Sequence, residues 1–265
     1  MNKCFLTTAV LLTAIAFSAY ADDGTDAKDM KELKMTPQIR PTDAGYYVAI
    51  DGGANFAQAT GSKKVYESQT GDGSNTTYGS GSDSLGAVGG LKVGYNFESY
   101  DLGGGFGLQP AVEAEAYYLN SYSKQTYPAT TAPRFAANGY REQYNDAAFM
   151  LNGLVRLKTG TFFTPYLGAG VGGEYISNSE ATLYDFKSGA QFHLSGDDDF
   201  VFAVQGIAGF DIEVAKHWDI FTEYKFIAGI DPSLSNSNSR INYTAKYEPG
   251  YIGQHLITAG LKYNF

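Results

Sequence analysis

Cysteine is almost absent from this chain of 265 residues, and its single example, Cys4, lies in the first apolar segment. That segment runs to Phe17 and is followed by Ala19-Tyr20-Ala21, a small-x-small sequence typical of a signal-peptide cleavage site. We therefore expect residues 1–21 to be a signal peptide that is cleaved near Ala21. The alternative, an N-terminal membrane anchor, needs about 20 apolar residues, and this run is interrupted. A cleaved chain would contain no thiol, which excludes disulfides and thiolate metal sites.

Charge is also scarce. Asp, Glu, Lys and Arg make up 18% of the chain, against about 25% in an average domain. The formal net charge is −9, and an acidic chain without a basic footprint is not expected to bind nucleic acid. Beyond the N-terminal segment there is no apolar run of about 18 residues, so the sequence predicts no membrane-spanning helix.

Glycine and aromatic residues are abundant instead, with 32 Gly, 21 Tyr and 17 Phe. This composition excludes a coiled coil, which is rich in Ala, Glu, Lys, Leu and Arg, and a disordered chain, which has few aromatic residues. Residues 22–44 differ from the rest because they are polar and contain Pro37 and Pro41. We expect them to form a periplasmic N-terminal extension, and residues 45–265 to form one domain.

From residue 45 onward, apolar residues recur at every second position in a series of short runs. This period places one face of a β-strand against an apolar environment. Eight such runs can be read from the sequence: 46–56, 85–97, 108–118, 147–158, 166–175, 202–213, 219–226 and 254–265.

The connections between these runs alternate in length. The long ones are 58–83, 123–145, 177–199 and 229–251, and the short ones are 98–107, 159–163 and 214–217. An up-and-down barrel of the outer membrane has long loops outside the cell and short turns in the periplasm. The sequence therefore predicts an all-β protein, an eight-stranded antiparallel up-and-down transmembrane β-barrel, with both chain termini on the periplasmic side.

The face opposite the apolar one carries glycines and charges of both signs. A soluble eight-stranded barrel would instead line its interior with apolar residues and expose the polar ones. The interior of an eight-stranded barrel is narrow, so charges placed there are expected to pair. The face also carries Asp51, Asp211 and Lys158. The charges that we expect to form a lumen ionic cluster are Lys92, Glu113, Glu115, Arg156, Glu174, Glu223, Lys225 and Lys262. Arg156 is the best candidate for a bridging cation, with one of the glutamates as its partner, because its planar fork can engage two carboxylates.

The last residues of the chain carry the sharpest motif. Thr258, Gly260, Tyr263 and Phe265 fit the pattern polar-x-Gly-x-x-aromatic-x-aromatic. This motif resembles the signal that the outer-membrane assembly machinery reads on the last strand of bacterial barrels. With SLGAVGGLKVGYNF, AVEAEAYYLN and TPYLGAGVG, the chain is similar to the small bacterial outer-membrane β-barrel family (porin-like, or like the OmpA transmembrane domain). The resemblance implies a Gram-negative envelope and eight strands, but no particular activity.

Aromatic residues gather near the ends of the runs, where membrane interfaces would place them in girdles. The residues concerned are Tyr46, Tyr47, Tyr95, Phe97, Tyr117, Tyr118, Tyr224, Phe226, Tyr263 and Phe265.

Other motifs are weak. Gly168, Gly170 and Gly173 match a dinucleotide fingerprint, but no helix is expected after them. Residues 197–199 are three consecutive aspartates that could bind a hard cation, although a solvated charge run is the simpler interpretation. The three histidines have no metal-ligand spacing.

We expect a non-enzymatic barrel with a structural or surface-interaction role. It would need no cofactor and would be a monomer. Its partners would be outer-membrane lipid, the assembly machinery and a surface partner bound through the loops. One alternative is a pore for ions or small solutes, and a second is an outer-membrane lipid-modifying enzyme.

Overall fold

The computed structural model describes residues 44–58, 63–69, 75–82, 84–126, 137–185, 189, 191–238, 243–247 and 251–265. The expected signal peptide and nearly all of the expected N-terminal extension, residues 1–43, lie outside this set. Every regular element within it is a β-strand. The described residues contain no helix with the length and apolar character that crossing a membrane requires.

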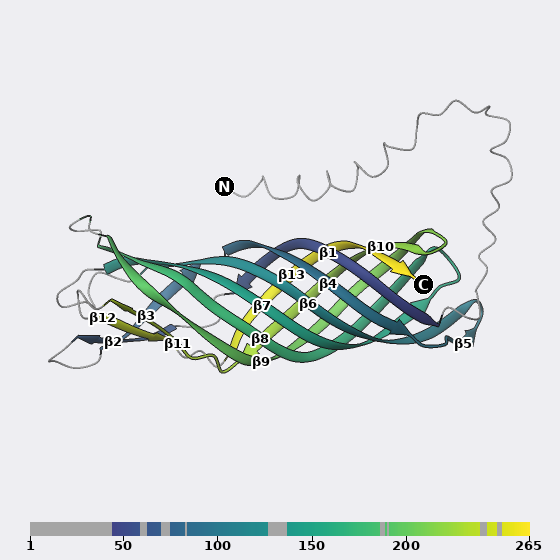
Figure 1. The fold of residues 1–265 in the computed structure, drawn as a ribbon, viewed down its shortest axis with the longest axis horizontal. Helices are drawn as coiled ribbons and strands as arrows, with labels where there is room; N and C mark the ends of the chain where they lie inside the picture. The colour runs from purple at the N-terminus through teal and green to yellow at the C-terminus, as the bar shows by residue number, and fades with distance from the viewer. Residues whose placement is uncertain are drawn as a thin grey trace, which may run out of the picture. The chain divides into compact units, whose positions relative to one another are not determined.

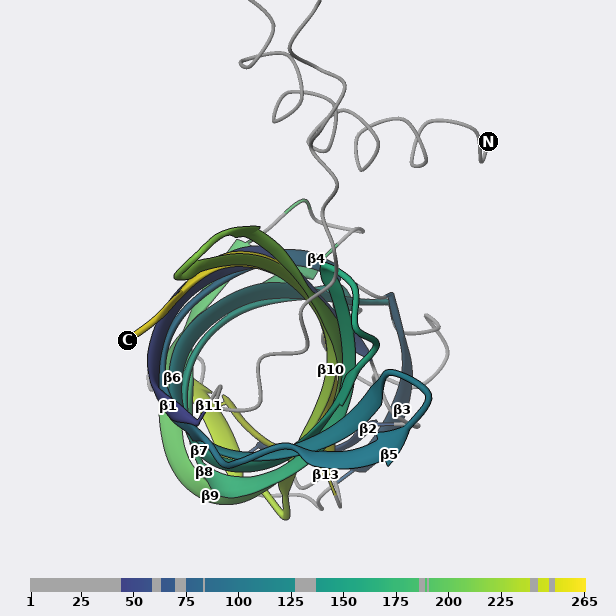
Figure 2. The same cartoon turned by 90° about the vertical axis from the view of Figure 1, so that its right-hand side faces the viewer.

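Eight long strands form a closed antiparallel ring, which confirms the predicted barrel (Figures 1 and 2). In order around the ring they are β1 (Gly45–Gln58), β4 (Ser84–Asn96), β6 (Phe106–Thr126), β7 (Ala137–Lys158), β8 (Phe163–Asp185), β9 (Gln191–Ala215), β10 (Trp218–Ile230) and β13 (Tyr251–Asn264). Pairing of β1 with β13 closes the ring, with Ile50 opposite Leu261. We call the end where β1 begins and β13 ends the terminal end, and the opposite end the distal end.

Four short strands continue the wall at the distal end (Figure 1): β2 (Lys63–Gln69), β3 (Asn75–Ser82), β11 (Leu234–Asn238) and β12 (Tyr243–Tyr247). They pair with one another and with the long strands in the order β6, β3, β2, β12, β11, β9. Together with β6 to β9 they make a second ring beyond the first. Between β10 and β11, Asp231 adopts a left-handed backbone conformation with φ of 56°, which Asp tolerates better than most residues.

The prediction that residues 58–83, 123–145, 177–199 and 229–251 are loops was therefore wrong for much of their length. Strands β6 to β9 run far into these segments, and β2, β3, β11 and β12 lie within them. The cause is compositional. Outside an apolar layer neither face of a strand needs apolar residues, so the period-two signal disappears while the backbone pairing continues.

The short connections lie at the terminal end. The predicted turn 98–107 contains a further strand, β5 (Tyr100–Gly103), which forms a hairpin with β6. Gly103, Gly104 and Gly105 all have positive φ, between 66° and 86°, a conformation that glycine adopts without the steric cost paid by other residues. The other two turns, around 159–163 and 214–217, join their strands directly.

The two faces of the barrel differ sharply in chemistry. Large apolar side chains on the outside are exposed, and six examples with exposures of 50–68% are Ile50, Leu91, Leu151, Leu167, Phe202 and Ile257. The interior holds buried polar and charged side chains from all eight strands. This is the reverse of a soluble barrel and matches a wall that faces lipid.

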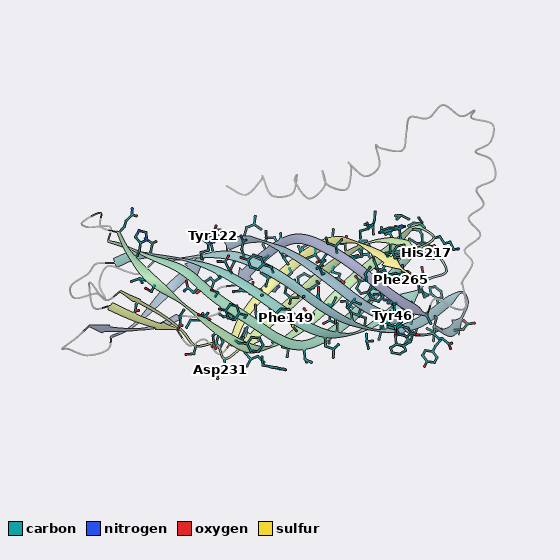
Figure 3. All side chains as sticks on the ribbon, in the orientation of Figure 1. Tyr46, Tyr122, Phe149, His217, Asp231 and Phe265 are labelled. Atoms are coloured by element: carbon teal, nitrogen blue, oxygen red, sulfur yellow. The ribbon has the colours of Figure 1, made fainter. Side chains whose placement is uncertain are left out.

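Aromatic side chains cluster on the outside near the terminal end (Figure 3 labels Tyr46 and Phe265). The ring centroids of Tyr46 and Tyr95 lie 5.0 Å apart, and those of Tyr263 and Phe265 lie 5.1 Å apart. Two tyrosines that the sequence placed in such a girdle, Tyr47 and Tyr117, are instead inside, where they are 1% and 4% exposed. Neighbouring residues of a strand point to opposite faces. Because Tyr46 and Tyr118 point outward, Tyr47 and Tyr117 beside them must point inward.

Candidate functional site in the barrel lumen

Charged side chains from β1, β4, β6 and β10 meet in the middle of the lumen and form what we call the central layer: Asp51, Lys92, Glu113, Glu115, Glu223 and Lys225. The Lys92 ammonium contacts Glu223 and lies 3.6 Å from Glu115 Oε1 and 3.9 Å from Asp51 Oδ2. The Lys225 ammonium contacts Glu115 and lies 3.2 Å from Asp51 Oδ2 and 3.2 Å from Glu223 Oε2. The two lysines therefore bridge the acids of this layer.

Amide side chains complete the central layer. Asn152 Nδ2 donates to Glu113 Oε1 at 3.0 Å and to Glu115 Oε2 at 3.1 Å. Gln205 Nε2 donates to Glu115 Oε2 at 3.2 Å, and its carbonyl accepts a hydrogen bond from the hydroxyl of Tyr117. These amides were missed by the sequence interpretation because they carry no charge. Their place on the inward-facing positions of β7 and β9 is the signal that could have found them.

A second group of charged side chains lies nearer the terminal end of the barrel, and we call it the terminal layer. It contains Arg156, Asp211, Asp219 and Lys262. Arg156 forms an ion pair with Asp211, and Lys262 Nζ lies 2.7 Å from Asp211 Oδ2 and 2.8 Å from Asp219 Oδ2. The expectation that Arg156 pairs with a glutamate and acts as the bridging cation is corrected: its ion partner is an aspartate. The bridging role belongs to Lys92 and Lys225.

Two buried tyrosines connect these layers. The Arg156 guanidinium lies 4.8 Å from the ring centre of Tyr166 and 5.4 Å from that of Tyr47. The Tyr166 hydroxyl donates to Glu223 Oε1 at 2.7 Å, and the Tyr47 hydroxyl donates to Glu113 Oε2 at 2.9 Å. Arg156 therefore reaches the glutamates only through these phenols.

Glu174 lies apart from the other seven residues of the expected ionic cluster. It belongs to a distal layer with Asp146, Asn55 and Gln254. Along β7, the inward side chains follow in the order Arg156, Leu154, Asn152, Met150, Ala148 and Asp146, so the apolar pair Met150 and Ala148 separates this layer from the central one. Asp146 was not expected to contribute, because the sequence placed the start of its strand after it.

The packed layers leave little room for a ligand in the centre of the lumen. Oxygens of Asp51, Glu115 and Glu223 lie within 4.8 Å of one another, as the ligands of a metal ion would. The ammonium groups of Lys92 and Lys225 already contact this trio. The two lysines thus occupy the position that a metal ion would take among these acids, and they hold the central layer together through buried ion pairs.

The residues of the expected assembly signal lie on β13, the strand that closes the barrel. Thr258 faces inward and is 1% exposed, whereas Phe265 is 72% exposed on the outside. A side chain on Gly260 would come within 2.3 Å of the Ile50 carbonyl and 2.5 Å of the Phe221 ring. The rings of Tyr263 and Trp218 pack edge to face, with their centres 4.9 Å apart.

The weaker motifs have ordinary structural roles. Gly168 and Gly170 lie in β8, with no helix after them, and leave space for the side chains of Leu154 and Asn152. Residues 197–199 lie in β9 rather than in a loop. The Tyr175 hydroxyl donates to Asp198 Oδ2 at 2.6 Å there.

No family model and no curated protein matches this sequence. Among solved structures, the chain is similar to Neisserial surface protein A, NspA, with 14% identity over 83% of this chain and 97% of that chain and a TM-score of 0.41. It is similar to the outer membrane protein OprG from Pseudomonas aeruginosa, with 18% identity over 84% and 96% of the two chains and a TM-score of 0.48. It is also similar to Ail, the attachment invasion locus protein of Yersinia pestis, with 10% identity over 83% and 99% and a TM-score of 0.33.

The structure itself establishes the architecture. Eight strands close into an antiparallel ring, apolar side chains cover its outside, and charged side chains fill its inside. The chain therefore folds as a small transmembrane β-barrel of the outer-membrane type.

Proposed function

We propose that the protein is an integral outer-membrane barrel with a closed, charge-paired lumen, and that it acts through its distal strands in a structural or surface-interaction role. The observation that carries this proposal is the burial of the central layer. The side chains of Asp51, Lys92, Glu115 and Lys225 are at most 1% exposed. Breaking one buried ion pair costs about 3–5 kcal/mol, which disfavours spontaneous opening of the lumen.

Two further features support the location and the role. The exposed apolar side chains occur on strands all around the ring, as a lipid-facing wall requires. Strands β6 to β9 extend past that wall and pair with β2, β3, β11 and β12. Long connections of outer-membrane barrels face the outside of the cell, so this distal ring is the part offered to a surface partner.

Conductance in planar bilayers tests the closed lumen. We expect the refolded wild type to give only small or rare current steps, and Arg156→Ala to raise their frequency or size. The substitution removes the Arg156 ion pair of Asp211, which keeps its contact with Lys262, and it removes the group that lies between Tyr47 and Tyr166. Lys216→Ala, a change in an exposed turn, is the matched control and should leave the steps unaltered.

Large, steady wild-type currents that ignore Arg156→Ala would overturn the closed lumen and favour the alternative of a pore for ions or small solutes. The second alternative, a lipid-modifying enzyme, would be supported by turnover of lipid A or phospholipid by the refolded barrel. We propose a non-enzymatic role, in which such turnover is absent.

A further inference from the structure

We propose that the distal layer of the lumen is a binding site for one divalent cation, Ca²⁺ being the best match, held by Asp146, Glu174 and Asn55. This site is separate from the central layer and from the role proposed above. Asp146 and Glu174 are buried acids that face each other in this layer. Asp146 is 2% exposed and Glu174 is 0% exposed, and across the described part of the chain no basic nitrogen lies within 4.0 Å of either carboxylate.

One amide holds the two carboxylates side by side. Gln254 Nε2 donates to Asp146 Oδ2 at 3.0 Å and to Glu174 Oε1 at 2.9 Å. A single nitrogen therefore brings one oxygen of each acid into the same neighbourhood. An amide hydrogen bond does not neutralise two negative charges, and unpaired charges are expensive to bury.

Three buried oxygens of the layer lack a hydrogen-bond partner among the described residues. Asp146 Oδ1 and Glu174 Oε2 are buried and accept no hydrogen bond from any described residue. Asn55 supplies the independent observation. Its side chain is 0% exposed, its Nδ2 donates to Gln254 Oε1 at 2.7 Å, and its Oδ1 also lacks a partner among the described residues.

The chemistry of these three oxygens selects the ion. Carboxylate and amide oxygens are ligands of hard cations, and Ca²⁺ accepts irregular sets of them completed by water. Two negative charges match a divalent ion. Along β7, Met150 and Ala148 lie between this site and the central layer. The ammonium groups of Lys92 and Lys225 therefore pair with the acids of the central layer and not with Asp146 or Glu174.

The wall of the barrel makes room for the Glu174 carboxylate itself. Gly229 on β10 faces Glu174, and a Cβ added there would lie 2.6 Å from Glu174 Oε2. Any other residue at this position would push the carboxylate out of place. The glycine therefore allows Glu174 to keep the position that the proposed site requires.

Terbium luminescence tests the site directly. Tb³⁺ takes the same oxygen ligands as Ca²⁺ and is sensitised by tyrosine, and Tyr144 faces the lumen two positions from Asp146 on β7. The refolded, EDTA-treated wild-type barrel is titrated with Tb³⁺, and the signal is then competed with Ca²⁺. We expect one saturable site per barrel, and a rise in the melting temperature with Ca²⁺.

Glu174→Gln and Asp146→Asn should abolish the saturable signal and the Ca²⁺-dependent rise, while heat-modifiable migration on gels reports that both variants fold. Asp198→Asn is the matched control, because it removes an exposed acid at the same end of the barrel and should keep both readouts. The proposal is overturned if wild type shows no saturable binding, or if the two variants bind Tb³⁺ as wild type does. It is also overturned if only pH, and not Ca²⁺, shifts the wild-type melting temperature, since the two acids would then share a proton.

Discussion

Glycine residues in this barrel reserve volume for the side chains that fill the lumen. A Cβ at Gly90 would lie 2.5 Å from Asp51 Oδ1, and one at Gly170 would lie 2.0 Å from Asn152 Oδ1. Asp51 belongs to the central layer, and Asn152 donates hydrogen bonds to two of its glutamates. In an eight-stranded barrel the interior is only just wide enough for side chains, so Asp51 and Asn152 each need a glycine on the neighbouring strand.

Gly260 gives the sharpest test at this scale, because the atoms that a new Cβ would meet include backbone. We expect Gly260→Ala to lower the free energy of unfolding by about 1–3 kcal/mol, the usual cost of overpacking. Urea unfolding of the refolded barrel in micelles measures it, with no assembly machinery present. Gly206→Ala is the control, since nothing lies within 4 Å of a Cβ there. An equal loss in both variants would mean that strand conformation, and not the contact with Ile50 and Phe221, is responsible.

At the scale of the strand, the period-two pattern predicts where a strand crosses the apolar layer and which way each residue points. It placed Glu113 and Glu115 on the inner face, and both are buried there. The pattern could not predict that Arg156 meets Asp211. Partners across a lumen depend on the stagger of all eight strands together, and no local segment encodes that quantity. Beyond the apolar layer the pattern is lost, so the true length of β6 to β9 was missed.

The final strand separates targeting from stability. Phe265 is mostly exposed and its ring contacts Tyr263 at the edge of the barrel. A charge on the lipid face near an interface costs only about 0–1 kcal/mol. We therefore expect Phe265→Asp to reduce the amount of heat-modifiable barrel in the membrane of cells while leaving refolding of the purified chain into micelles almost unchanged.

Heat-modifiable migration on gels, applied to membranes and to refolded protein, compares the two. Phe163→Asp supplies a control aromatic position at the same end of the barrel but outside the C-terminal motif. Unchanged assembly of Phe265→Asp in cells would argue against the assembly signal, and failed refolding in micelles would assign the defect to packing.

At the scale of the whole molecule, the two ends of the barrel should face different compartments. If the signal peptide is cleaved, the mature chain has no cysteine, so single cysteines can report orientation. We expect a membrane-impermeant maleimide to label Ser195→Cys on intact cells, because Ser195 is exposed at the distal end. Lys216→Cys, in the turn at the terminal end, should react only after the envelope is permeabilised. The reverse pattern would invert the topology.

Two rings share the strands β6, β7, β8 and β9, which we call the common half-wall. The other four strands differ between the two rings. In the first ring these four strands are joined by β1, β4, β10 and β13, and in the second by β2, β3, β11 and β12. The charged layers draw their side chains from the first set of partners and from the common half-wall. New sequences grafted onto β2, β3, β11 and β12 would therefore leave the ion pairs of the terminal and central layers in place, so the distal ring can change its sequence on a constant scaffold.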